Sequence, residues 1–357
     1  ITSSRQFSNL LKEIIKKGGI PVIISHFGRP KGKKNNNFSL KKITKSLSKH
    51  LKKKVVFCKN CIGPDVKEIL NKIKIGQIVL LENLRFHKGE SDNCGKFAKQ
   101  LAENCDVYIN DAFSASHRKH ASIDKITNLL PSGIGKNMEN EILNLNIFLK
   151  KPKKPLTAII GGAKMENKIT LISNLIKRSK YLILGGGIAN TFLKANNFNI
   201  GNSIYEKKQL LNVIKIQKEA KRNNCFIILP EDLKVMDNKK IKEISISEVK
   251  NNHQIFDLGK ISLWVISKII NNSKTIIWSG PIGYFEKKPF DKGTNQIVSL
   301  INSKKKIISI AGGGDTIAAI KRNKKIKNFN FLSTGGGAFL HWLEKFSLPG
   351  IEALKKN

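Results

Sequence analysis

Ten short apolar runs, each followed by a polar stretch with helical periodicity, are the feature that most limits the possible folds of this chain. The runs are four to six residues long, rich in Ile and Val, and mostly do not alternate with polar residues. Such runs are typical of strands buried on both faces of a parallel sheet. They lie at residues 20–25, 55–58, 78–81, 107–110, 156–160, 181–184, 226–229, 275–278, 307–310 and 329–333. Strands that alternate with helices predict an α/β fold built from βαβ units.

The length of 357 residues exceeds one ordinary domain and fits two. A helical pattern at 137–149 places four apolar residues on one stripe and ends before Pro152 and Pro155, which stop a helix. We expect the domain boundary along this helix. The predicted divisions are an N-terminal lobe at 1–134, an interdomain helix at 135–150, a C-terminal lobe at 151–340, and a tail at 341–357 that packs back near the hinge or the N-terminal lobe.

A net charge of +39, from 65 basic and 26 acidic residues, suggests on its own a nucleic-acid or anionic-membrane partner. However, only seven basic residues are Arg, and the lysines are spread along the chain together with abundant Asn and Ile. Lys, Asn and Ile all have AT-rich codons, so we interpret the charge as compositional drift that leaves a solvated lysine surface. We therefore expect neither a nucleic-acid nor a membrane partner, and a dedicated polyanion-binding surface is the alternative.

Cysteine content and hydropathy bear on the compartment. The five Cys are odd in number and form no regular framework, which favours a reducing cytoplasm. No apolar run approaches the roughly 18–20 residues of a membrane helix, and no signal-peptide pattern opens the chain. The chain opens with Ile1, without an initiator Met, so an N-terminal piece is expected to be missing from the record.

Arginines follow three of the predicted strands in the first half of the chain. Arg29 follows the first run, Arg85 the third and Arg118 the fourth. Ligands of open parallel sheets bind at the carboxyl ends of the strands. Arg grips phosphate or carboxylate with two parallel hydrogen bonds, and Lys does not replace it there without loss. This placement predicts an arginine-lined pocket for a small, multiply charged anion, and ordinary ion pairs at loop starts are the alternative.

Glycine clusters follow the predicted strands in the second half. They begin at Gly161, Gly185, Gly280, Gly312 and Gly335. Glycines at a strand-to-helix turn let backbone N–H groups approach phosphate oxygens, and the helix N-terminus adds a favourable dipole. Five such turns favour a phosphate-binding role over glycines that only cap or pack.

Charged residues accompany these glycines. Asp315 is placed to hold Mg²⁺ bound to nucleotide phosphates. Lys164 and Lys168 are spaced i, i+4 at the expected start of a helix, so both can point at one phosphate. The sequence contains neither the GxxxxGK[ST] phosphate loop nor the GxGxxG dinucleotide motif, which disfavours a nicotinamide dehydrogenase.

Eight strings, in this order, resemble the phosphoglycerate kinase family along nearly the whole chain. They are SHFGRPKG, LLENLRFHKGE, NDAFSASHR, GGAKMENKI, GGGIANTFL, WSGPIGYFE, AGGGDT and STGGGAFL. The resemblance implies a cytoplasmic, monomeric glycolytic kinase with two Rossmann-like lobes that close on each other. It implies that the N-terminal lobe binds 3-phosphoglycerate or 1,3-bisphosphoglycerate and that the C-terminal lobe binds ATP or ADP with Mg²⁺.

The resemblance also implies roles for particular residues. The substrate clamp would comprise His26, Phe27, Gly28, Arg29, Arg85 and Arg118. The phosphate-transfer lysines would be Lys164 and Lys168, and Gly314 and Gly337 would offer backbone amides to the transferred group. The nucleotide site would comprise Lys168, Gly185, Gly186, Gly187, Glu286, Gly313, Gly314, Asp315 and Thr316, with Glu286 on the ribose and Asp315 on the metal.

Three departures from the family pattern matter. The opening strand with its Arg-x-Asp-x-Asn motif is absent. The next catalytic arginine is assigned to Arg5 with a local slip, although counting back from His26 gives Ser3. The usual Trp-Asn-Gly-Pro has Ser279 in place of Asn. A degenerate relative without activity is therefore the main alternative to an active kinase.

Overall fold

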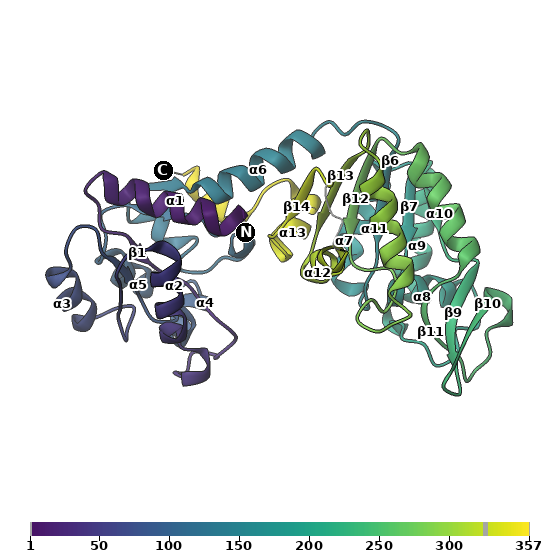
Figure 1. Ribbon diagram of the computed structural model, residues 1–357, viewed down its shortest axis with the longest axis horizontal. Coiled ribbons are helices and arrows are strands. Elements are labelled where there is room, and N and C mark those ends of the chain that lie inside the picture. Colours follow the sequence, from purple (N-terminus) through teal and green to yellow (C-terminus); the bar gives the residue numbers. More distant parts are fainter. Residues whose placement is uncertain (1, 324–327, 357) are drawn as a thin grey trace. The chain divides into compact units, whose positions relative to one another are not determined.

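The chain forms two compact units in a computed structural model that describes residues 2–323 and 328–356 (Figure 1). Unit 1 comprises Ile1–Leu143 together with Ser347–Asn357, and unit 2 comprises Asn144–Phe346. The division falls within α6 (Lys136–Leu149). Met138, Leu145 and Leu149 of this helix are fully buried, as expected for one apolar stripe on a helix.

Unit 1 contains two small parallel sheets. β1 (Val22–Ile23), β3 (Ile78–Leu80) and β2 (Val55–Phe57) pair in that order, and β4 (Tyr108–Asn110) pairs with β5 (Ser132–Ile134). The helices of this unit are α1 (Thr2–Lys16), α2 (Thr44–Leu51), α3 (Pro64–Lys72), α4 (Lys88–Ser91), α5 (Gly95–Ala102) and α14 (Pro349–Leu354), together with the start of α6.

The core of unit 1 joins its helices to the sheet. Val66 of α3 and Leu101 of α5 belong to one buried cluster with Val79 of β3. The C-terminal segment is bonded into the same unit, because the Gly350 N–H donates to the Ser116 carbonyl at 2.9 Å. Removing these apolar side chains from water is the main stabilising contribution.

Unit 2 is built on a six-stranded parallel sheet with the order β14-β13-β12-β6-β7-β8. Its strands are β6 (Leu156–Ile160), β7 (Tyr181–Leu184), β8 (Phe226–Ile228), β12 (Thr275–Ser279), β13 (Ile308–Gly312) and β14 (Phe331–Ser333). β9 (Asp232–Asp237), β10 (Lys240–Ser245) and β11 (Gln254–Leu258) form a separate antiparallel sheet.

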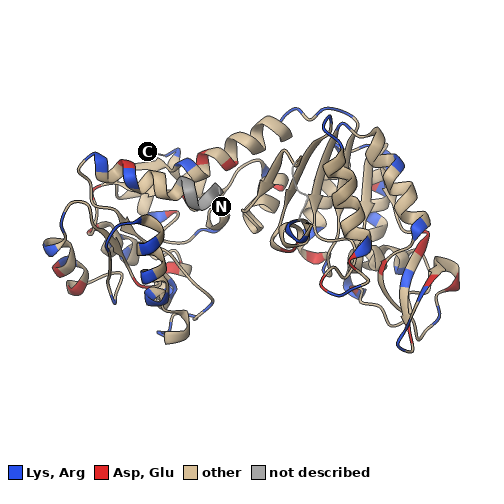
Figure 2. Ribbon diagram, viewed as in Figure 1, with Lys and Arg blue, Asp and Glu red and all other residues tan. Residues whose placement is uncertain are grey.

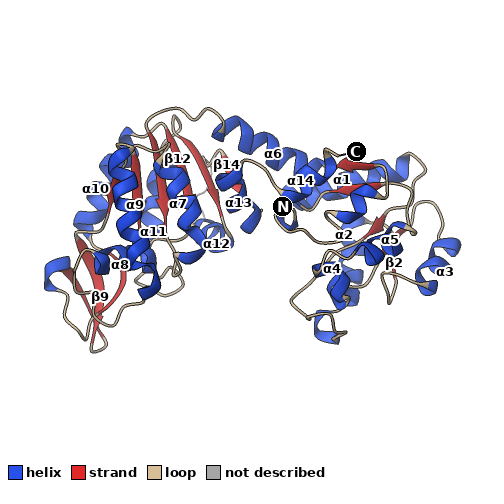
Figure 3. Cartoon of the chain, turned by 180° about the vertical axis from the view of Figure 1, so that it is seen from behind, coloured by secondary structure: helices blue, strands red, loops and turns tan. Residues whose placement is uncertain are grey.

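Helices flank the large sheet (Figure 3). They are α7 (Ile169–Ile176), α8 (Gly186–Ala195), α9 (Leu210–Arg222), α10 (Lys260–Asn272), α11 (Lys292–Ser303), α12 (Gly314–Arg322) and α13 (Gly337–Lys345). α10 packs against α11 and α11 against α12, whereas α7 packs against α9 and α13. In the first group, Ile266, Ile297 and Ile320 lie in one cluster with the buried Trp278 of β12.

The predicted α/β class with parallel sheets is confirmed, and each of the ten apolar runs overlaps an observed strand. Four further strands in the described part of the chain, β5 and β9–β11, were not predicted. β10 is almost entirely exposed and rich in lysine, so it lacks the apolar run by which the others were recognised. Lysine and arginine are distributed over the elements of both units (Figure 2).

Candidate active site

An arginine-lined cavity of about 220 Å³ lies in unit 1. Its lining residues are Arg29, Lys31, Arg85, Ser91, Arg118 and His120. The structure therefore brings together the three arginines that follow three different strands in the sequence. Guanidinium groups gathered in this way suit a ligand that carries several negative charges.

Arg85 is the most constrained of these three arginines. Only 9% of its surface is exposed, and its Nη1 donates to the Gly28 carbonyl at 2.8 Å. Its Nη2 is buried and has no hydrogen-bond partner among the described residues. Burial, followed by the charge of Arg118, lowers the pKa of Arg85. Leaving a buried cationic donor without an acceptor costs free energy, so this arrangement favours binding of an anion that supplies the acceptor.

Asn83 fixes the loop that carries the predicted clamp, and sequence reasoning missed this residue. Its side chain is fully buried in the segment that follows β3. Its Nδ2 donates to the carbonyls of Phe27 and Phe38 at 2.7 and 2.9 Å. Its Oδ1 accepts from the N–H groups of Phe27 and Arg85 at 3.3 and 3.1 Å. One amide side chain thus holds both sides of the loop against the strand end.

His26, Phe27 and Gly28 lie on this loop. Burial, followed by the charge of Arg85, lowers the pKa of His26 to about 4. His26 is therefore neutral near pH 7, so its contribution to an anion site is hydrogen bonding rather than charge. Phe27 is 54% exposed. Gly28 has φ +64°, and a Cβ there would lie 2.3 Å from Cδ1 of Phe38, so the turn requires glycine.

A buried carboxylate balances the charge of the cavity, and sequence reasoning missed it as well. Glu90 is 1% exposed and accepts from the backbone N–H and the hydroxyl of Ser122 at 3.0 and 2.7 Å. Its Oε1 lies 3.5 Å from Nδ1 of His120, which lines the cavity. Glu90 acts through contacts with Ser122 and His120, which are distant in the sequence, so no local pattern marks it.

Arg5, the predicted catalytic arginine, lies within α1. Its side chain, like that of Ser3, lies outside the described part of the chain. The assignment of the catalytic arginine to Arg5 stays a prediction.

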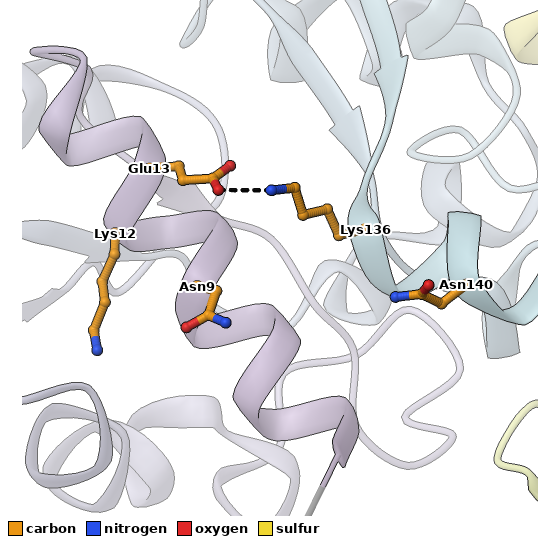
Figure 4. Close-up of a pocket in the computed structure, with 5 residues that line it drawn as sticks. All are labelled: Asn9, Lys12, Glu13, Lys136 and Asn140. Carbon is orange, nitrogen blue, oxygen red and sulfur yellow. Dashed lines mark hydrogen bonds and ion pairs between the residues drawn. The ribbon is translucent and has the colours of Figure 1, made fainter.

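A second cavity of unit 1, of about 270 Å³, lies between α1 and the start of α6. Figure 4 shows Glu13 and Lys136 pointing toward each other, with their charged atoms 2.6 Å apart. The hydrogen bond from Lys136 lowers the pKa of Glu13. Asn9, Lys12 and Asn140 complete the lining, so the opposite charges here already satisfy each other.

The Lys168 side chain lies at the carboxyl ends of two strands of unit 2. Its Nζ donates to the carbonyls of Gly161 and Ser279, at 2.7 and 3.2 Å. These residues follow β6 and end β12, which are paired in parallel register. Burial lowers the pKa of Lys168 to about 8, although the charge of Asp315 raises it. A half-buried ammonium that has only carbonyl partners keeps attraction for a phosphate.

Lys164 is arranged differently from the expectation. The predicted helix at 164–168 is wrong, because Lys164 precedes a 3₁₀ turn (Glu166–Lys168) and α7 begins at Ile169. Lys164 is exposed. The i, i+4 argument for two lysines on one helical face therefore fails. Lys164 can reach a shared phosphate only by the flexibility of its own side chain.

Two sets of glycines at these strand ends have contrasting surroundings. Gly161, Gly187 and Gly280 pack against backbone, since a Cβ on each would lie 2.0 to 2.5 Å from a carbonyl oxygen. In contrast, a Cβ on Gly314 or Gly336 would meet nothing within 4 Å. The first set holds the strand ends together, and only the second leaves open space in which a phosphate can approach the backbone.

The open glycines lie at the starts of two helices. α12 starts at Gly314 and α13 at Gly337, and the residues before them, Gly313 and Gly336, have φ +105° and +52°. Thr316, in the first turn of α12, is buried, and its hydroxyl accepts from the Gly280 N–H at 2.6 Å. The free N–H groups of the first helical turn form a favourable anion site.

The glycines that were predicted to bind the nucleotide follow β7, which neighbours β6 in the sheet. Gly185 follows β7, and α8 begins at Gly186, whose φ is +62°. Glu286 is exposed in the turn after β12. Arg322 holds this turn, since its Nη1 donates to the Phe285 carbonyl at 2.8 Å and its guanidinium lies 5.0 Å from the centre of the Phe285 ring.

The donor set fits a magnesium ion that arrives with phosphates. Among the described residues, no three His, Cys, Asp or Glu side chains gather into a metal-binding group. Asp315 is exposed in the first turn of α12. Magnesium in nucleotide sites usually takes one or two protein carboxylates and completes its shell with phosphate oxygens and water. A single carboxylate beside open glycines matches that pattern.

Unit 1 has an arginine-lined cavity, and unit 2 has open glycines at helix starts and a half-buried lysine at its strand ends. These features suit an α/β protein that binds phosphate groups, such as a phosphotransferase. Comparison with known proteins identifies the family. The family model for phosphoglycerate kinase matches residues 2–345. The phosphoglycerate kinase of Wolbachia sp. subsp. Brugia malayi is 44% identical over 355 residues, covering 97% of this chain and 88% of that protein. The phosphoglycerate kinase of Orientia tsutsugamushi (strain Ikeda) is 45% identical, covering 97% and 87%.

Solved structures agree with these sequences. The phosphoglycerate kinase from Coxiella burnetii superposes with a TM-score of 0.85 at 35% identity, covering 98% of this chain and 89% of that one. The enzyme from Pyrococcus horikoshii has a TM-score of 0.84 at 27% identity, covering 99% and 90%. This chain belongs to the phosphoglycerate kinase family and is a phosphotransferase. Within the described residues, no helix has the length and apolarity needed to cross a membrane.

Proposed function

We propose that this enzyme transfers a phosphoryl group reversibly between 1,3-bisphosphoglycerate with ADP and 3-phosphoglycerate with ATP, as a cytoplasmic monomer. The lobe at 1–134 would bind the phosphoglycerate and the lobe at 151–340 the nucleotide, with the helix at 135–150 between them and the tail at 341–357 packed near the N-terminal lobe. The observation that carries the proposal is the arginine cavity of unit 1, with its unpartnered Arg85 Nη2.

The phosphoglycerate would bind by its charges. Arg29, Arg85 and Arg118 would hold its phosphate and carboxylate, since guanidinium groups bind such oxyanions through paired hydrogen bonds. His26, neutral near pH 7, would add a hydrogen bond to the same ligand. The segment Phe27–Gly28 is held beside these groups by Asn83, which supports a preformed site. Arg5 would supply a further cation.

The nucleotide would bind at the strand ends of unit 2. Gly185, Gly186 and Gly187 would face the base, and Glu286 the ribose. The N–H groups around Gly313, Gly314 and Thr316 would hold the phosphates at the start of α12. Asp315 would hold Mg²⁺, which supplies a positive charge that offsets the charge developing on the phosphate oxygens.

Charge stabilisation and positioning would account for the chemistry. The attacking carboxylate of 3-phosphoglycerate is already ionised near pH 7, so the reaction needs no general base. Lys168, Lys164 and the backbone amides of Gly314 and Gly337 would surround the transferred phosphoryl group. Lys168 is held in advance by two carbonyls, so it would need little reorganisation as charge develops.

The test is a coupled assay of the purified full chain with 3-phosphoglycerate and Mg-ATP. We expect saturable turnover with both substrates and none when either substrate or Mg²⁺ is omitted. Absence of turnover in a folded preparation would instead support the degenerate relative. Salt-sensitive binding to nucleic acid without saturable binding of Mg-ATP would support the polyanion-binding alternative.

A further inference from the structure

One of the seven arginines connects the two ends of unit 2. Arg178 follows α7, and its guanidinium donates to the Leu149 carbonyl at the end of α6. The same guanidinium lies over the ring of Phe346, with its central carbon 4.6 Å from the ring centre. Phe346 caps α13 in a left-handed conformation with φ +52°. The chain enters unit 2 just before Leu149 and leaves it just after Phe346.

A second contact joins α7 to α13. The Asn174 side chain in α7 donates to the Glu344 carbonyl in α13 at 2.6 Å. α7 and α13 also pack against each other. Arg178 and Asn174 therefore tie the C-terminal ends of these two helices together.

The opposite ends of these helices carry the proposed transfer groups. α7 begins directly after Lys168, and α13 begins at Gly337, where Gly336 leaves open space. Helices of eight and nine residues span only about 12–14 Å and behave as rigid rods at that length. A shift of α7 against α13 at the Arg178 end would be transmitted to Lys168 and Gly337 at the other end.

We propose that Arg178 is a positioning residue for phosphoryl transfer, which sets the spacing between Lys168 and the amides at Gly337 through α7 and α13. The inference rests on the proposed function, because it concerns the same transfer groups. A lysine could not replace this arginine. The planar guanidinium stacks on a ring and donates to a carbonyl at once, whereas an ammonium is a compact point charge.

The test is the variant Arg178→Lys, which keeps the charge but loses the fork and the stacking. We expect kcat to fall about tenfold while both KM values stay within about twofold, because the transfer groups act mainly in the transition state. The matched control is Arg222→Lys, at the exposed end of α9, which should stay within about twofold of the parent. A kcat for Arg178→Lys equal to that of the control would overturn the proposal.

Two further measurements separate positioning from general stability. In a Lys168→Ala background, Arg178→Lys should lower kcat by less than about threefold. If Arg178 acts by positioning Lys168, most of its effect on kcat is already lost when Lys168 is removed. A full tenfold loss in that background would overturn the proposal. If Arg178→Lys does not fold, Asn174→Ala removes the second contact and is judged by the same loss of kcat. An inactive parent enzyme would contradict the proposed function instead, so the two failures are distinguishable.

Discussion

The Lys168 ammonium donates to the Gly161 carbonyl at 2.7 Å, and it bridges to the neighbouring strand end through the Ser279 carbonyl. Both partners are backbone atoms, so neither can turn away or neutralise the charge. A cation fixed in this manner is suited to a developing negative charge, since its orientation is set before the reaction begins.

Replacing Lys168 by Ala should lower kcat by at least about 10²-fold, the order seen when one such donor is lost. The measurement is steady-state kinetics in the coupled assay. The control is Lys194→Ala, an exposed lysine in the last turn of α8, which should leave kcat unchanged. A near-normal rate for Lys168→Ala would remove this lysine from the transfer step.

The lowered pKa of Lys168, about 8, predicts a pH dependence. The ammonium is present below this pKa and is lost as the pH rises through it, so kcat/KM should fall above about pH 8. The value of kcat should begin to fall at a higher pH than kcat/KM does, because bound phosphate stabilises the charged form of Lys168. Lys168→Arg, which stays charged, should be slower but flat from pH 7 to 9.5 once the profile is corrected for substrate ionisation. An unchanged alkaline limb in that variant would assign the limb to another group.

Arg118→Lys tests the arginine cavity. The Nε of Arg118 donates to Nε2 of His117 at 3.2 Å, which orients the guanidinium beside the cavity. A lysine keeps the charge but loses the paired hydrogen bonds, so the KM for 3-phosphoglycerate should rise by about 10- to 100-fold. The KM for ATP should not change, and it is the internal control. Equal KM values for 3-phosphoglycerate in parent and variant would exclude Arg118 from the clamp.

The fold could be predicted from the sequence where burial leaves a compositional signal. β6 and β12 are buried along their whole length, so their apolar runs mark them directly. β10 faces solvent along most of its length and carries Lys240, Lys242 and Glu243, so it resembles a loop in composition. β5 contains Ser132 and Gly133 and was missed for the same reason.

The candidate site could be predicted where residues follow strands directly. Arg29, Arg85 and Arg118 follow β1, β3 and β4 along the chain and line one cavity, although β4 belongs to a separate sheet. Asn83 and Glu90 act through long-range hydrogen bonds, which no local pattern encodes. The error at Lys164 has a similar origin, because the 3₁₀ turn before α7 depends on tertiary contacts such as the bonds from Lys168. The roles of all these residues stay predictions until the variants are measured.

Glu90→Gln should lower the stability of unit 1 and increase the stabilisation that a bound anion gives to it. The buried carboxylate accepts two hydrogen bonds from Ser122 and faces His120, so the loss of its charge should cost about 1–3 kcal/mol. The arginines would then lack their buried counter-charge, and 3-phosphoglycerate should raise the Tm of the variant by more than that of the parent. Differential scanning calorimetry with and without ligand measures both effects. Glu68→Gln, which breaks an exposed i, i+4 pair with Lys72, should change neither.

The buried Asp257 in unit 2 predicts that the free energy of unfolding falls as the pH rises, which is opposite to the usual effect of a carboxylate. Its side chain is fully buried, it accepts from the Gly293 N–H at 2.8 Å, and its Oδ1 has no hydrogen-bond partner among the described residues. Burial raises its pKa from 3.8 to about 6, and Lys234, 4.0 Å away, compensates only in part. The folded state therefore holds a proton that the unfolded chain releases between about pH 4 and 6. The resulting stabilisation is complete below pH 4 and lost as the pH rises through 6.

Asp257→Asn removes this titration, so its stability relative to the parent should rise by about 3 kcal/mol between pH 4 and pH 7. All three tryptophans, Trp264, Trp278 and Trp342, belong to unit 2, so their fluorescence during urea unfolding reports on this unit. Asp237→Asn is the contrasting control. Its carboxylate is paired with Lys242 and its pKa is lowered below 3.8, so its titration lies mostly below pH 4 and the stability of that variant relative to the parent should stay flat between pH 4 and pH 7. Parallel pH curves for the parent and Asp257→Asn would show that Asp257 ionises in the folded state as it does in the unfolded chain.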